Sequence, residues 1–463
     1  MRSLALLGLL ASAATAGDHP NMVVVFIDDM GWADFSCFGN TEASTPNIDR
    51  LAADGIRFEQ FYVNSPICSP SRVALSTGQY PQRWRISSYL SNRKANAARG
   101  IADWLDPSAP MLARDLKRSG YVTGHFGKWH MGGQRDVHEA PLIEAYGFDE
   151  SLTNFEGLGP RVLGLKHSPG KEQTPVHGLG SMDLGHGPVV LEDRSRVTET
   201  FVEAALAFIH FATETGQPFY LNLWPDDVHT PMHPPLELWE EERRPRYLRV
   251  LEEMDRQLAP LFDRIREDPG LRDNTIVLVC SDNGPEVGFG SAGRFKGCKA
   301  TLYEGGIRSP LIVWAPGLMP AEAQGSLNTE SVLSAIDLVP SLLALVGPVP
   351  EAAYDGEDLS GTLLGREEGS RAAPLFFRRP PDRENFRHHK GLPDLALRRG
   401  RWKVLCDYDG GNAMLYDLAS DPSESTDRAH EHGELTGELA AAVVAWHRAL
   451  PQDTGPAGVA TRK

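Results

Sequence analysis

The sequence predicts an α/β fold, in which a large domain with a mostly parallel central sheet flanked by helices precedes a smaller C-terminal α+β domain with an antiparallel sheet. Two observations support this prediction. Short apolar, β-branched runs alternate with longer segments of helical periodicity, which is typical of a parallel sheet buried on both faces. The chain also has 463 residues, more than a single core usually holds, which favours one large and one smaller domain.

Four apolar runs are predicted to form buried strands of the large sheet: residues 23–27, 218–223, 275–280 and 311–314. Apolar residues recur at helical spacing over 197–208 and 247–262, which predicts helices that cross over the sheet. A shorter helix is expected to begin at Pro46 and to end at Gly55. The hydroxyl of Thr45 is the expected N-cap, because threonine before a proline is a common helix start.

The second half of the pattern predicts the domain boundary. Residues 156–192 are rich in Gly, Pro and His without periodicity, so we expect a long surface loop there. A helical stretch over 331–346 is followed by a proline-containing break. The smaller domain is then indicated by two strand-like segments and a final helix, at 374–377, 401–406 and 434–450. We therefore place the large domain at 17–365 and the C-terminal domain at 366–463.

The composition excludes several classes of protein. Lys and Arg number 46 against 62 Asp and Glu, a formal net charge of −16. A protein that binds nucleic acid or an anionic membrane non-specifically needs a positive field over its contact surface, so we expect neither partner. An anionic substrate is compatible with this charge if positive side chains gather in one cleft.

The N-terminal segment is similar to a secretory signal. Arg2 precedes an apolar run over 4–14 that ends in small residues, so we expect a signal peptide over 1–16 and a secreted or periplasmic mature protein. An uncleaved anchor is the less favoured alternative. The chain has 5 cysteines and no C-x-x-C spacing. An odd number in an exported protein leaves at least one thiol unpaired, and that thiol needs an explanation.

Polar side chains follow two of the predicted strands directly. Asp28 and Asp29 follow the run at 23–27, and Asp282 and Asn283 follow the run at 275–280. Ligands of open α/β sheets bind at the carboxyl ends of strands, so these four side chains are expected to share one crevice. Carboxylate and amide oxygens suit Ca²⁺ or Mg²⁺ better than Zn²⁺. Taken singly, an aspartate after a strand is more often a turn or helix cap than a metal ligand, and it is the paired arrangement that favours a metal.

The segment Cys68-Ser69-Pro70-Ser71-Arg72 is the second concentration of chemistry. Ser69 is predicted to cap a helix whose first residue is Pro70, which places Cys68 just before a helix N-terminus. The amide groups and the dipole at such a terminus favour an anion, and Arg72 adds a positive charge one turn away. A buried structural cysteine is the alternative interpretation.

This segment resembles the signature of the type I sulfatases, Cys-x-Pro-Ser-Arg. Further segments are similar to motifs of that family and occur in the expected order: 28–32, 45–51, 127–130, 229–231, 281–284, 299–308 and 337–341. The resemblance is dense from residue 21 to about 346 and weak beyond, where it rests on 415–418 and 421–422. It implies an alkaline-phosphatase-like large domain and a sulfatase activity. The substrate that we expect by analogy with the family is a sulfated carbohydrate.

The resemblance also implies the active-site roles. In the family the cysteine is oxidised to formylglycine by a formylglycine-generating enzyme, so Cys68 becomes the nucleophile. One Ca²⁺ ion would be bound by Asp28, Asp29, Asp282 and Asn283, with the modified Cys68 side chain at the ion. The other residues that match catalytic positions of the family are Arg72, Lys128, His130, His229 and Lys299. Lys296 lies close to Lys299, but the spacing to Glu304-Gly305-Gly306 selects Lys299.

The family chemistry is a double displacement. One hydroxyl of the hydrated formylglycine attacks sulfur, releasing the alcohol and leaving a covalent sulfate ester. The second hydroxyl then loses its proton and expels sulfate as the aldehyde re-forms. Ca²⁺, Lys128 and Lys299 would hold the sulfate, Arg72 the formylglycine and metal region, and His130 the hydrate. His229 would protonate the leaving oxygen, a role suited to a side chain that titrates near neutral pH.

Two departures from the family pattern are visible. Ala300 stands where the family often has glycine, and the segment before His229 contains the acidic pair Asp226 and Asp227. We hypothesise that one of these aspartates faces a substrate hydroxyl, because an acidic pair beside a sulfate site is otherwise costly. We expect His388 and His389 to lie in a solvated loop rather than in a carbohydrate subsite.

Two other functions compete with a sulfatase. A phosphodiesterase or phosphonate monoester hydrolase of the same superfamily would share the fold and the nucleophile. A catalytically silent carbohydrate-binding relative would keep the fold without turnover. The silent relative is disfavoured because the set of catalytic matches is complete: Cys68, Arg72, Lys128, His130, His229 and Lys299.

Overall fold

The computed structural model describes residues 19–133, 135–154, 157–175, 185–348, 354–382 and 391–454. The predicted signal peptide over 1–16 lies outside the described residues, and so do His388 and His389.

The large sheet is mixed but mostly parallel, as predicted. Its main path runs in the order β11 (Ser326–Asn328), β2 (Ile56–Tyr62), β10 (Arg308–Trp314), β9 (Thr275–Ser281), β1 (Asn21–Ile27), β8 (Phe219–Trp224), β3 (Val122–Lys128), β4 (Glu150–Asn154), β5 (Arg161–Ser168) and β6 (Lys171–Pro175). Beside this path, β12 (Leu333–Ser334) pairs with β2 and β7 (Val189–Asp193) pairs with β5. Among the described strands of this large sheet, only β10 and β6 run antiparallel to their neighbours.

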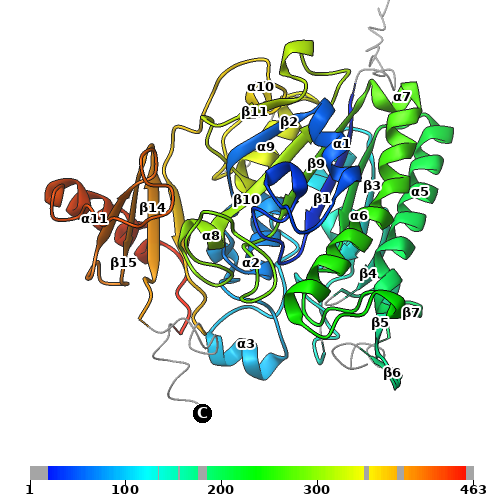
Figure 1. Ribbon diagram of the computed structural model, residues 1–463, viewed down its shortest axis with the longest axis horizontal. Coiled ribbons are helices and arrows are strands. Elements are labelled where there is room, and N and C mark those ends of the chain that lie inside the picture. Colours follow the sequence, from blue (N-terminus) through cyan, green and yellow to red (C-terminus); the bar gives the residue numbers. More distant parts are fainter. Residues whose placement is uncertain are drawn as a thin grey trace, which may run out of the picture.

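Helices cover both faces of this sheet (Figure 1). Alternate residues of β1 point to opposite faces: Val23 and Val25 join a cluster with α1, α5 and α6, whereas Val24 and Phe26 join one with α2, α4 and α9. The described helices are α1 (Pro46–Asp54), α2 (Cys68–Thr77), α3 (Arg93–Arg99), α4 (Leu112–Arg118), α5 (Val197–Thr215), α6 (Arg243–Glu267), α7 (Pro269–Arg272), α8 (Glu304–Ile307), α9 (Ala335–Ala344), α10 (Ser360–Leu363) and α11 (Gly433–Ala449).

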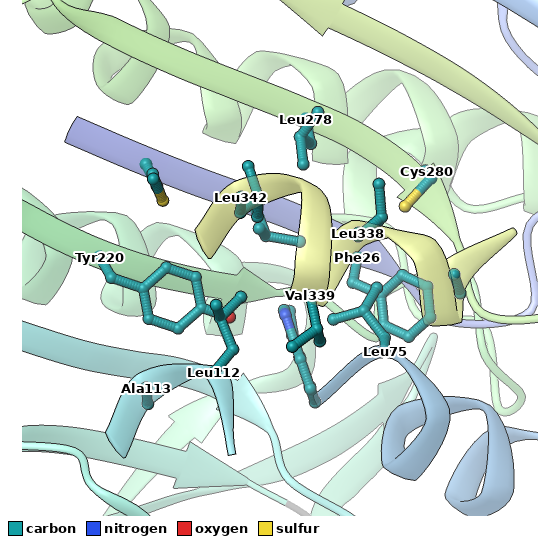
Figure 2. Close-up of a cluster of buried hydrophobic side chains, with 14 of the residues drawn as sticks. Phe26, Leu75, Leu112, Ala113, Tyr220, Leu278, Cys280, Leu338, Val339 and Leu342 are labelled. Carbon is teal, nitrogen blue, oxygen red and sulfur yellow. The ribbon is translucent and has the colours of Figure 1, made fainter. Parts of the chain in front are cut away.

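Helix α9 lies against the centre of the sheet. Figure 2 shows its Leu338, Val339 and Leu342 between residues of the central strands, such as Leu278, and side chains of α2 and α4. Leu338 is 1% exposed. The capping box of Ser334 and Asp337 fixes where this helix begins. It therefore starts later than the predicted stretch over 331–346, because Leu333 and Ser334 pair with β2 instead.

The C-terminal part is a separate antiparallel sheet with one helix, as predicted. Its order is β13 (Leu375–Arg378), β14 (Leu395–Arg399), β15 (Trp402–Cys406) and β16 (Met414–Asp417). Helix α11 packs its Leu439 and Val443 against this sheet, which stands at one side of the large domain in Figure 1. The final helix and two of these strands were predicted.

Two local predictions were wrong. The segment 156–192 is not a single loop, because β5, β6 and β7 extend the sheet there. Strand β6 is solvent-exposed along most of its length, and an edge strand held by backbone pairing needs no apolar pattern.

Thr45 precedes α1 but does not cap it. Its hydroxyl accepts from the Ser36 N–H at 3.0 Å, while the carboxylate of Asp255 on α6 accepts from the N–H groups of Asn47 and Ile48 at 3.1 and 2.9 Å. A tertiary contact with α6 thus satisfies backbone N–H groups that the Thr45 hydroxyl was expected to satisfy.

None of the helices within the described ranges is long and apolar enough to cross a bilayer.

Truncating Leu338 is expected to weaken the fold. Leu338→Ala opens a cavity where α9 meets the sheet, so the free energy of unfolding should fall by about 2–5 kcal/mol. Leu327→Ala is the control, because Leu327 is 44% exposed and its loss should change stability little. Urea unfolding of both variants measures the difference, and equal losses would contradict the packing described for α9.

Candidate active site

Four neighbouring parallel strands end at one crevice. Strands β9, β1, β8 and β3 lie side by side in this order, and each is followed by polar residues at its carboxyl end. The register pairs Ile27 with Ser281, so the next residues, Asp28 and Asp282, leave the sheet together. The prediction that both strands deliver their side chains to one place is confirmed.

Three carboxylates meet at this edge without access to solvent. Ligand oxygens of Asp28, Asp29 and Asp282 lie within 4.8 Å of one another, and all three residues are 0% exposed. The Asp29 N–H donates to Asp282 Oδ1 at 3.0 Å, and the amide of Asn283 donates to Asp29 Oδ1 at 2.8 Å. The four side chains form one cluster from two strands.

Three cations balance the carboxylates. Arg72 contacts Asp282 Oδ2 at 3.0 Å and Asp28 Oδ1 at 3.2 Å. The Lys128 ammonium lies 2.5 Å from Asp28 Oδ2, and the Lys299 ammonium pairs with Asp29. Uncompensated charges would be prohibitive at this depth, so each cation is needed for the carboxylates to stay ionised.

The pKa values of the two strand-end aspartates diverge. Burial alone would raise the pKa of Asp28, but Lys128, His229 and Arg72 together hold it well below its usual range. Burial and the negative charge of Asp28 raise the pKa of Asp282 well above its usual range. The two carboxylates thus disfavour each other's ionised form. A metal cation bound beside Asp28 and Asp282 would stabilise the ionised form of both.

The donor set fits a hard divalent cation. Asn283 Oδ1 is buried and accepts no hydrogen bond from the described residues. Such orphaned acceptors are rare in folded proteins unless an ion or water binds them. Carboxylate and amide oxygens are the ligands that Ca²⁺ and Mg²⁺ take, so the residues present suit the cation that the sequence predicts.

Cys68 is the first residue of α2 and is buried beside this cluster. Burial raises the pKa of its thiol to about 11, although Lys128 and Lys299 act in the opposite direction. The N-cap residue is Ile67 rather than Ser69, so the predicted cap was wrong. The Ser69 hydroxyl instead accepts from the Leu90 N–H at 2.9 Å, which fastens the start of α2 to the following loop.

Two histidines flank the cluster. His229 Nε2 lies 3.6 Å from Asp29 Oδ2, and its Nδ1 lies 2.7 Å from the Thr230 carbonyl oxygen. Since a carbonyl only accepts, Nδ1 carries a hydrogen and Nε2 faces the cluster. His130 Nε2 donates to the Leu90 carbonyl at 3.2 Å, the residue that also holds Ser69. Burial and Lys128 lower the pKa of His229 to about 4 and that of His130 below its usual range.

The loop that carries Lys299 is anchored by the C-terminal sheet. Ala300 has φ of 65°, a backbone conformation that glycine adopts without strain. This explains why the family pattern that the sequence resembles has glycine at this position. The Glu304 N–H donates to Glu424 at 2.7 Å, and Lys403 of β15 binds both glutamates at 2.9 and 2.8 Å. Lys296 points elsewhere, with its ammonium 4.1 Å from the centre of the Tyr303 ring.

The hypothesis for the acidic pair is wrong. The Asp226 carboxylate accepts from Asn154 at 2.8 Å and pairs with Arg194 at 3.0 Å. Asp227 accepts the hydroxyl of Thr198. Both aspartates are buried and bind protein groups, so neither is directed at a substrate hydroxyl. The cost of an acidic pair is offset by Arg194, which the sequence pattern did not single out.

Glu286 was missed in the sequence. Its carboxylate accepts the Thr230 hydroxyl at 2.9 Å. Burial and the charge of Asp29 raise its pKa, while Lys299 lowers it. It lies in the loop after Asn283, two residues beyond the recognised motif at 281–284. That proximity was the available signal.

All five cysteines are free thiols. Cys280 is buried in the core cluster beneath α9, where it packs among apolar side chains.

Comparison with known proteins identifies the chemistry of this arrangement. The model of the family described as Sulfatase matches residues 20–348. Human arylsulfatase A is 32% identical over 476 aligned positions, which cover 92% of this chain and 86% of that protein. The N-acetylgalactosamine-6-O-sulfatase of Bacteroides thetaiotaomicron is 29% identical over 495 positions, covering 91% of each chain.

A solved structure agrees with the fold. It comes from work on glycosaminoglycan metabolism by Bacteroides thetaiotaomicron and superposes with a TM-score of 0.74 at 25% identity. The match covers 93% of this chain and 99% of that one, so it includes the large sheet and the small C-terminal sheet.

Proposed function

Because the chain belongs to the sulfatase family and is a sulfuric ester hydrolase, we propose that its substrates are sulfated carbohydrates. Support comes from the Bacteroides relative, which is named for a sulfated amino sugar, and from the solved neighbour of glycosaminoglycan metabolism. The observation that carries the proposal is the convergence of Lys128, Lys299 and Arg72 around Cys68 in an otherwise acidic protein.

We propose that Cys68 acts as formylglycine. The pKa of the unmodified thiol is raised to about 11, so it stays protonated at neutral pH and is a poor nucleophile. Oxidation to the aldehyde by a formylglycine-generating enzyme removes this obstacle, since the hydrated aldehyde supplies a hydroxyl for attack on sulfur. The resemblance of residues 68–72 to the family signature supports this assignment.

We further propose that Asp28, Asp29, Asp282 and Asn283 hold one Ca²⁺ ion, with the modified Cys68 beside it. When bound, the ion polarises the sulfate oxygens and lowers the pKa of a hydroxyl near it. The buried Oδ1 of Asn283, which accepts no hydrogen bond from the described residues, supports this assignment.

The chain's own side chains then bind the ester. Lys128 pairs with Asp28 and Lys299 with Asp29. Each ammonium has three N–H donors, so besides binding its aspartate it can donate to an oxygen of the sulfate. Arg72 stays buried between Asp28 and Asp282 and holds the two strand ends in register.

His229 is proposed to protonate the departing alcohol. Its Nδ1 hydrogen is committed to the Thr230 carbonyl, so the proton for transfer sits on Nε2, which faces the cluster. The pKa of about 4 belongs to a site without sulfate. An anionic group beside the ring favours the imidazolium and therefore raises this pKa when substrate binds. His130 is proposed to orient the hydrated nucleophile, because it is tied through Leu90 to Ser69.

We propose an extracytoplasmic location. It is supported by the apolar run over 4–14 after Arg2, which is typical of a secretory signal.

Sulfate release tests the proposed function. Protein co-expressed with a formylglycine-generating enzyme is assayed with Ca²⁺ on a 6-sulfated amino sugar, an aryl sulfate and an aryl phosphodiester. We expect turnover of the sulfate esters and its loss in Cys68→Ala, with Cys280→Ala as the control because Cys280 lies in the core. Faster turnover of the phosphodiester, or activity retained in Cys68→Ala, would contradict the proposal.

Replacing His229 is expected to discriminate between leaving groups. A sugar alkoxide needs a proton to depart, whereas 4-nitrophenolate does not. His229→Ala should therefore lower kcat on the sulfated sugar by about 10²–10⁴-fold and on 4-nitrophenyl sulfate much less. His210→Ala, an exposed change on α5, is the control. Equal losses on both substrates would argue against a role as general acid.

A further inference from the structure

A groove lies beside His229, at the edge of the candidate active site. It has a volume of about 800 Å³ and is lined by the turn between β5 and β6, by residues 230–233 and by the start of α6. Thr230 and Glu286 form a wall of this groove and are joined by a 2.9 Å hydrogen bond. Thr230 directly follows His229 and Glu286 lies in the loop after Asn283, so the groove adjoins the candidate active site.

Three cations line the groove: Lys171 on β6 and Arg243 and Arg246 in the first turn of α6. Within the described part of the chain, none of the three forms an ion pair with a carboxylate. The two acidic residues of the lining are engaged by other donors. Glu241 accepts from the indole of Trp239 at 3.1 Å, and Glu286 accepts from Thr230.

Arg246 is held in place before any ligand arrives. Its Nε donates to the Glu240 carbonyl at 2.5 Å and its Nη2 to the Glu241 carbonyl at 2.7 Å. Its guanidinium carbon lies 4.2 Å from the centre of the Trp239 ring. A guanidinium fixed on an aromatic ring by neutral acceptors keeps its full charge and loses little entropy on binding an anion.

The surroundings of the groove favour negative charge further. Arg243 begins α6, a helix of 25 residues, and the amide groups at a helix N-terminus attract anions. The whole protein carries a formal charge of −16, whereas the groove lining has three cations against the two carboxylates of Glu241 and Glu286. A neutral sugar would gain nothing from this charge, whereas a sulfate or carboxylate would gain charge-assisted hydrogen bonds.

We propose that this groove is a second anion subsite, which binds a sulfate or carboxylate on the sugar unit that follows the one bearing the reacting ester. Lys171, Arg243 and Arg246 are the residues that recognise it. The inference rests on the proposed function, and it specifies the substrate class: an oligosaccharide with at least two anionic groups, oriented so that its chain leaves the crevice past Thr230. The three cations are specificity residues and take no part in the cleavage.

Binding to protein that cannot turn over tests the subsite. The probe is a chondroitin 6-sulfate tetrasaccharide, titrated calorimetrically into Cys68→Ala protein. The double variant Lys171→Gln/Arg243→Gln removes two charges, and neither side chain forms a hydrogen bond with the described residues, so the variant should fold normally. We expect its Kd for the tetrasaccharide to rise about tenfold, with a weaker dependence on salt. Arg249→Gln is the matched control, because Arg249 is an exposed arginine of the same helix paired with Glu252.

A second readout separates the subsite from a general field effect. In the active protein, the double variant should raise KM for the tetrasaccharide but leave the kinetics on 4-nitrophenyl sulfate, which has one anionic group, unchanged. An unchanged Kd, an equal loss in Arg249→Gln, equal losses on both substrates or no binding of the tetrasaccharide would each overturn the subsite. If no sulfate ester is turned over but the Kd difference persists, the proposed function fails and the groove remains a binding site.

Discussion

The burial of three carboxylates at the ends of two adjacent parallel strands is the constraint on which the rest of the site depends. Asp28, Asp29 and Asp282 are brought together by the pairing of β1 with β9, and at this depth they demand positive charge. Arg72, Lys128 and Lys299 come from three other parts of the chain to supply it. The cations that balance the buried carboxylates include the two lysines that we propose to bind the sulfate ester.

This electrostatic constraint explains why distant elements are fastened so firmly. Lys128 ends β3, and Lys299 lies in a loop held by Glu424 and Lys403 of the C-terminal part. The small sheet thus contributes no residue to the carboxylate cluster, yet it fixes the loop that carries one of the cations. Its helix α11 has its own apolar core with the sheet, so this support does not depend on the catalytic crevice.

The sequence was most informative where chemistry and periodicity coincide. Apolar runs followed at once by Asp28 and by Asp282 identified both the sheet and its functional edge, because strand ends converge in parallel sheets. Cys68 and its neighbours gave the family through a motif that spacing alone would have left as an ordinary helix start. The positions of Lys128, His229 and Lys299 followed from motif similarity, and the structure places all of them at the carboxylates.

What the sequence concealed were contacts between distant segments. Asp255 caps α1 from α6, a pairing across more than two hundred residues, so the local signal at Thr45 misled. Arg194 neutralises Asp226 from a different element, which converted a supposed substrate contact into a structural pair. Strand β6 carries no apolar alternation because it lies at the sheet edge. That Lys171, Arg243 and Arg246 line one groove without an ion pair among the described residues is likewise visible only in three dimensions.

Calcium titration of metal-free protein tests the central claim most directly. We expect the wild-type chain to bind one Ca²⁺ ion. Asn283→Ala should weaken this binding at least about tenfold, since it removes an oxygen ligand without changing any charge. Asn222→Ala is the matched control, because Asn222 is also a buried asparagine on the central sheet whose Oδ1 accepts no hydrogen bond, and its affinity should equal that of the wild type. Absence of calcium binding, or equal affinity in Asn283→Ala, would contradict a metal centre at the ends of β1 and β9.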